Sequence, residues 1–62
     1  MIEAKDNKGK TIARVSSKEE RDLDYFVMKY MIANGITFAD LTVDNRHIMY
    51  GIADNQLMKV KA

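Results

Sequence analysis

The absence of cysteine from a chain of only 62 residues is the feature that most constrains its fold. Disulfides and thiolate metal sites are excluded, and a domain of this size buries only about 60% of the surface that its unfolded chain exposes. Natural proteins below roughly 70–80 residues often add a disulfide, a metal or a partner subunit. We therefore expect residues 1–62 to form a single small domain that gains stability by associating with itself or with another protein.

The charges are nearly balanced, with ten basic and nine acidic residues and a net charge of +1. One sign of charge dominates in most strong nucleic-acid binders, so this balance makes nucleic acid a less favoured partner. No apolar run approaches the ~18 residues that a membrane span needs. Glu3, Lys5 and Asp6 interrupt the start of the chain, which does not resemble a signal peptide. We expect a cytoplasmic protein without a membrane partner.

Residues 1–16 have the pattern of a β-hairpin. Met1 to Lys5 alternates apolar with charged residues, and Thr11 to Val15 is rich in β-branched residues. Between them, Asp6-Asn7-Lys8-Gly9 supplies residues that tolerate the left-handed conformation. This pattern predicts a turn in which Gly9 has a positive φ.

Residues 17–34 have the clearest pattern, that of a helix. Ser16 and Ser17 are both suitable N-caps, and each has a glutamate three positions later, so either could form a capping box. Asn34-Gly35 predicts the helix end, with Gly35 in the left-handed C′ position.

Two apolar stripes lie on almost opposite sides of this predicted helix. One consists of Leu23, Phe26, Val27 and Tyr30, and the other of Tyr25, Met28 and Ile32. A helix on one small sheet needs only one stripe. The second stripe is therefore covered either by a loop or terminus of the chain or by another protein. We favour another protein and predict Tyr25, Met28 and Ile32 as the partner-binding residues.

Residues 36–62 favour three strands, with Asp44-Asn45 and Asp54-Asn55 as the turns between them. Within each predicted strand, alternation places a group of apolar residues on one face. These groups are Ala39, Leu41 and Val43; Ile48, Tyr50 and Ile52; and Met58 and Val60. The alternative is a second helix over residues 38–53 with Thr37 as its cap. Thr42, Val43 and Gly51 disfavour that helix. The predicted fold class is α+β in the order ββαβββ, with one helix packed on an antiparallel sheet.

The chain offers no recognisable constellation for catalysis. Gly9-Lys10-Thr11 matches the end of a phosphate-binding loop, but Ala4 stands where the earlier glycine is needed and a strand follows where a helix is needed. His47 is the only histidine, and Asp44 is the only carboxylate near it in sequence. A metal site needs about three protein ligands. We expect no enzymatic activity, no cofactor and no metal.

Part of the pattern resembles the ribbon–helix–helix repressors. The strand Thr11–Val15, the helix Lys18–Ala33, the Asn34-Gly35 turn and a possible helix Phe38–Ala53 follow their order over about two thirds of the chain. The resemblance implies a dimer that inserts a two-stranded ribbon into the major groove, with Lys10 and Arg14 as the nucleic-acid-binding residues. Such a repressor is the alternative; the favoured function is a small regulatory protein-interaction module, acting as a homodimer or bound to a larger partner.

Overall fold

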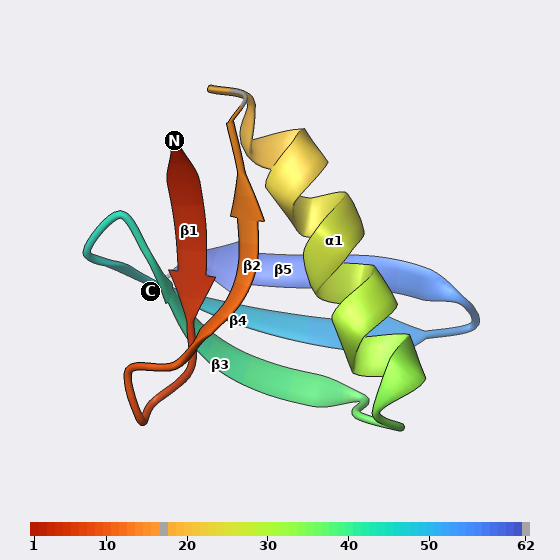
Figure 1. Ribbon diagram of the computed structural model, residues 1–62. Helices are drawn as coiled ribbons and strands as arrows, with labels where there is room; N and C mark the ends of the chain where they lie inside the picture. The colour runs from red at the N-terminus through yellow and green to blue at the C-terminus, as the bar shows by residue number, and fades with distance from the viewer. Residues whose placement is uncertain (17, 62) are drawn as a thin grey trace.

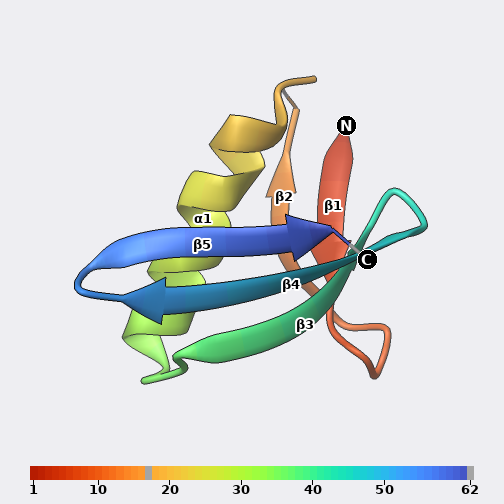
Figure 2. The ribbon, with the colours of Figure 1, turned by 180° about the vertical axis from the view of Figure 1, so that it is seen from behind.

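A computed structural model of the chain describes residues 1–16 and 18–61. In this part of the chain, five strands form one antiparallel sheet in the order β2-β1-β3-β4-β5, and one helix packs on it (Figure 1). The elements are β1 (Ile2–Lys5), β2 (Thr11–Val15), α1 (Glu20–Ala33), β3 (Phe38–Val43), β4 (Arg46–Ala53) and β5 (Gln56–Lys61). The predicted α+β class and the order ββαβββ are confirmed. Seen from behind, β3, β4 and β5 have no helix over their outer face (Figure 2).

The β1–β2 hairpin forms as predicted. Gly9 has φ +81°, and one carboxylate oxygen of Asp6 accepts hydrogen bonds of 2.9 Å from the backbone N–H groups of Lys8 and Lys10. These hydrogen bonds favour the ionised carboxylate and lower the pKa of Asp6. Ala4 pairs with Ala13 and Lys5 with Thr11, so Ile12 is an extra residue in β2, which forms a bulge.

The helix begins later than its serines predict. Its first residue is Glu20 and its N-cap is Glu19, whereas Ser16 is exposed and lies outside the helix, so the prediction for Ser16 is wrong. Val15 is still held in β2 opposite Ile2, and the chain needs linking residues before it can cross onto the sheet. Ser17 lies outside the described residues.

The helix ends as its sequence predicts. Gly35 has φ +66° and donates its N–H to the carbonyl of Ile32, while Ile36 donates to the carbonyl of Met31 at 2.8 Å. This pair of hydrogen bonds is a Schellman motif with Gly35 at C′. It turns the chain directly into β3.

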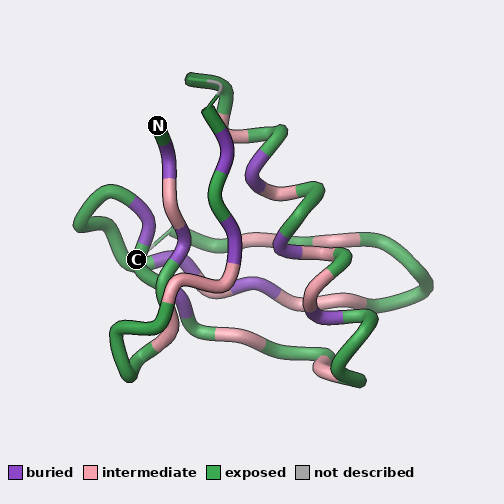
Figure 3. Tube along the Cα trace, viewed as in Figure 1, coloured by how far each residue is buried: buried purple, intermediate pink, exposed green. Residues whose placement is uncertain are grey.

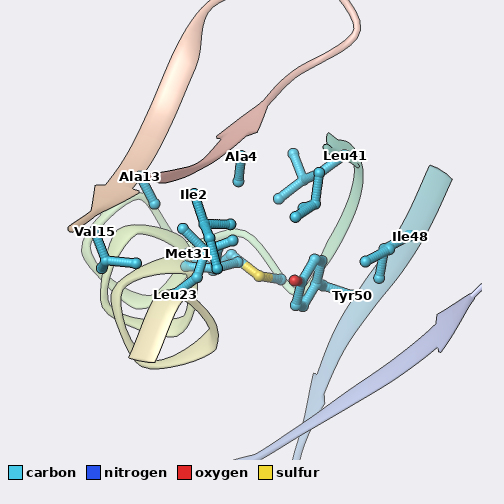
Figure 4. Packing of buried hydrophobic residues seen from close by; sticks show 11 residues of the cluster. Ile2, Ala4, Ala13, Val15, Leu23, Met31, Leu41, Ile48 and Tyr50 are labelled. Atoms are coloured by element: carbon cyan, nitrogen blue, oxygen red, sulfur yellow. The ribbon is translucent and has the colours of Figure 1, made fainter. Parts of the chain in front are cut away.

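The buried stripe of α1 is rotated from the predicted one. Leu23, Val27 and Met31 are fully buried, but Phe26 is 45% exposed and Tyr30 is half-buried (Figure 3). The helix packs against the β1–β2 hairpin as well as the meander, and the arc that faces both contains Met31 rather than Phe26. The core then joins these three residues to both groups of strands (Figure 4): Ile2, Ala4, Ala13, Val15, Leu41, Val43, Ile48 and Tyr50.

The C-terminal half is a meander of three strands, so the alternative helix over residues 38–53 is wrong. With it, the second helix implied by the ribbon–helix–helix resemblance is also absent from this fold. Both Asp-Asn pairs have positive φ at both residues, between 50° and 64°, as a two-residue type I′ turn requires. This turn chemistry and the β-branched residues before it explain why strands form.

Candidate functional site

A polar network joins the start of α1 to strands β4 and β5. The Lys59 ammonium lies 2.8 Å from an Asp24 carboxylate oxygen and 3.2 Å from one of Glu20. Lys61 and Arg46 also contact Glu20, at 3.3 and 3.4 Å. The hydroxyl of Tyr50, whose ring is fully buried, donates a 2.9 Å hydrogen bond to Asp24. The network therefore satisfies the polar groups where the apolar core ends.

The network shifts the protonation equilibria of its members. Burial opposes ionisation of Glu20, but the ammonium groups of Lys59 and Lys61 outweigh it and lower the pKa of that carboxyl. Burial opposes the charge of Lys59 as well, yet Asp24 and Glu20 raise the pKa of its ammonium. The pKa of the Tyr50 hydroxyl is raised strongly, mainly by burial and secondly by its hydrogen bond to Asp24. All three shifts stabilise the protonation states present at neutral pH.

This network sets an unusual orientation at the end of β5, beyond Leu57, which packs against the core. In a sheet with one covered face, apolar residues normally point inward and polar ones outward. In β5, Lys59 and Lys61 reach toward the helix, so Met58 and Val60 lie on the uncovered face. The sequence correctly placed Met58 and Val60 together, but it gave no sign that theirs is the open face.

An apolar surface results, which we call the open-face patch: Phe38, Met49, Met58 and Val60. Met49 lies opposite Val60, and Gly51 lies between Phe38 and Met58, so the four side chains occupy two adjacent rows. Phe38 is 61% exposed, Met58 56% and Val60 59%, whereas Met49 is half-buried. The sequence does not reveal this patch, because its residues come from three strands whose registry is set only in the fold.

The predicted partner-binding residues lie on the outer side of α1, and we call them the outer helix stripe: Tyr25, Met28 and Ile32. Tyr25 and Ile32 are each 59% exposed, and Met28 is half-buried. The Lys29 ammonium lies 5.4 Å from the centre of the Tyr25 ring, and Phe26 meets the same ring edge-on. The described residues of the chain leave Tyr25 and Ile32 exposed, and binding of a partner here stays a prediction.

His47 contacts a carboxylate other than the expected one. Its Nε2 pairs with Asp40, on the neighbouring strand β3, rather than with Asp44. Thr42 lies directly opposite His47, and Asp40 is two residues away on the same face. Both side chains are about half exposed, so water surrounds the pair rather than an enclosed reaction site. A carboxylate that orients an imidazole occurs in catalytic sites, but the same pair is also common on protein surfaces.

The residues of the DNA-binding alternative lie on the β1–β2 hairpin. Arg14 is held by Glu3 on β1, with a 2.7 Å hydrogen bond from its Nε to the carboxylate. Lys10 is exposed in the turn before β2. The Gly9-Lys10-Thr11 segment leads into a strand, so it lacks the helix amides that hold a phosphate.

Within residues 1–16 and 18–61, no helix is long and apolar enough to cross a membrane. In the same residues, no three side chains of His, Cys, Asp or Glu gather closely enough to hold a metal ion. Comparison with known protein families, with curated proteins and with solved structures finds no match to this chain.

Proposed function

We propose that this protein is a small non-enzymatic interaction module that forms a homodimer through its open-face patch. The observation that carries the proposal is the orientation of residues 58–61 in β5: Lys59 and Lys61 point toward the helix while Met58 and Val60 point into solvent. Its regulatory role and its cytoplasmic location stay predictions from the sequence.

The physical gain from covering the patch is large for so small a protein. Burying a large apolar side chain contributes about 1.5–3 kcal/mol, and a small domain has only about 5–15 kcal/mol of total stability. Stacking two sheets face to face, about 10 Å apart, buries such side chains in a shared core. A two-fold axis brings the same patch of each copy together, which makes a second copy the simplest partner.

The outer helix stripe is the second candidate contact, and its exposed Tyr25 and Ile32 favour it. The open-face patch is better suited because its side chains are contiguous across three strands. In the outer helix stripe, the Lys29 ammonium already lies over the Tyr25 ring, so this ring has a partner within its own chain.

Sedimentation equilibrium of three single variants tests the proposal. Val60→Glu places a charge in the open-face patch, and Gln56→Glu places the same charge on the same strand and face outside it. Ile32→Lys changes the outer helix stripe. We expect Val60→Glu to be monomeric and the other two to be dimeric, like the wild type.

Three outcomes contradict this function. A wild type that sediments as a monomer at millimolar concentration would show that no homodimer forms. A dimeric Val60→Glu variant with a monomeric Ile32→Lys variant would show that the interface is the outer helix stripe. Salt-dependent DNA binding that Arg14→Ala abolishes supports the repressor alternative instead.

A further inference from the structure

The first half of β3 has no strand on the side that faces the hairpin. β1 pairs with β3 only through Ala4–Val43 and Lys5–Thr42, after which the hairpin turn carries the chain away. Figures 1 and 2 both show β3 continuing beyond this crossing with β4 as its one neighbouring strand. Within the described chain, residues 38–41 therefore form an edge of the sheet in addition to β2 and β5.

The registry identifies which backbone groups point out from this edge. The N–H of Ile52 donates to the carbonyl of Thr37 at 2.9 Å, and hydrogen-bonded pairs alternate with non-hydrogen-bonded ones along an antiparallel ladder. Ala39 is therefore hydrogen-bonded to β4, whereas the N–H and C=O groups of Phe38 and Asp40 point to the free edge. These groups form a short template for another strand.

A depression of about 270 Å³ lies beside this edge. Its apolar lining comes from the β2 bulge, the end of α1 and β3, through Ile12, Tyr30, Ile36, Phe38, Ala39 and Leu41. Ile12, Tyr30, Ile36 and Ala39 are only partly buried against the core, so apolar surface remains accessible there. Asp6 and Asp40 are the charged residues that line it in the described chain.

We propose that the free edge of β3 and this depression bind an extended peptide in which apolar residues alternate with basic ones. The peptide pairs with Phe38 and Asp40 as an added strand, a known mode of peptide recognition. Because side chains alternate between the two faces of a strand, one set enters the depression among Ile12, Tyr30 and Ile36. The other set lies on the open face beside the Asp40 carboxylate, which His47 also contacts, and a lysine or arginine there complements the negative charge.

This site shares Phe38 with the open-face patch, but it does not depend on the homodimer. The patch presents the side chains of Phe38 on β3 and of its β4 and β5 residues from the face of the sheet. The peptide site presents backbone groups from the opposite edge of the meander, with the depression on the helix side. Val60→Glu, which disrupts the proposed dimer, leaves the peptide site intact.

An NMR titration of the 15N-labelled chain with the acetylated, amidated peptide Lys-Val-Lys-Val-Lys-Val tests the site. We expect the amide signals of Phe38 and Asp40 to shift and the Asp40 amide to become protected from hydrogen exchange. A peptide with glutamate in place of lysine should bind at least tenfold more weakly. A peptide that is N-methylated on every residue should not bind, because it lacks the backbone donors on both of its edges.

Two variants separate the backbone from the charge. Asp40→Asn keeps the N–H and should lower the affinity several-fold, whereas Asp40→Pro removes the outward N–H and should abolish binding. Proline is tolerated at a strand edge when its missing N–H faces solvent. If Asp40→Pro does not fold, the N-methylated peptide makes the same test on the wild type.

The proposal is overturned by shifts confined to β2 or β5, by equal binding of the N-methylated peptide, or by no shift at millimolar peptide. Protection of the Asp40 amide without peptide, in a chain that self-associates, would instead show that a second copy occupies the edge.

Discussion

Tyr50 combines a fully buried ring with a hydroxyl group that needs a hydrogen-bond acceptor. Asp24 supplies that acceptor at 2.9 Å, so Tyr50→Phe should lower the free energy of unfolding by about 1 kcal/mol. Tyr25→Phe removes a hydroxyl from an exposed ring and is the matched control, with no expected change. Urea denaturation measures both. Equal stability of wild type and Tyr50→Phe would show that the hydrogen bond contributes nothing.

The glycines differ in what their backbone requires. Gly9 has φ +81° and open space where a Cβ would lie, so Gly9→Val should cost about 1–2 kcal/mol through the backbone alone. Gly51 has no such φ, and a Cβ there would make an ordinary 3.7 Å contact with the Thr37 carbonyl. Gly51→Ala should therefore be nearly neutral. Thermal melts compare the two, and a Gly9→Val that melts like the wild type contradicts the assigned turn.

At the scale of the helix, the two methionines test its orientation. Met31 is fully buried and Met28 is half-buried, so Met31→Ala should cost about 2–5 kcal/mol and Met28→Ala clearly less. Chemical denaturation of both variants measures the difference. The reverse order would mean that the helix is rotated and that the outer helix stripe is not exposed.

The contacts between α1 and β5 predict two limbs of pH dependence. The lowered pKa of Glu20 means that the unfolded chain binds more protons, so stability is lost as the pH falls below about 4.5. The raised pKa values of Tyr50 and Lys59 contribute stability that is complete below about pH 10 and is lost as the pH rises further. Glu20→Gln should flatten the acid limb, measured by urea denaturation from pH 3 to 7. An unchanged acid limb would contradict the role of Glu20.

Local sequence signals predicted the elements well and their mutual placement poorly. Asn34-Gly35 and the two Asp-Asn pairs act within a few residues, so the helix end and both meander turns were predictable. Ser16 carries the same signal as a true cap, and only the length of β2 shows that it lies too early. The pairing of β1 with β3 joins residues about forty positions apart, and no local pattern encodes it.

The candidate surfaces divide in the same way. The outer helix stripe follows from helical periodicity and was predicted, whereas the open-face patch depends on which way β5 faces. Lys59 and Lys61 look like solvent-exposed residues until Glu20 and Asp24 are placed beside them. His47 likewise meets Asp40 only through the β3–β4 registry.

For the whole molecule, the central claim is that one face of the sheet is a self-association surface. Isotope-filtered NMR on a mixture of labelled and unlabelled chains tests it most directly, because it detects contacts between copies alone. We expect intermolecular NOEs from the methyl groups of Met58 and Val60 to the Phe38 ring. Intermolecular NOEs that involve Ile32 and Tyr25 instead, or none at millimolar concentration, would contradict the claim.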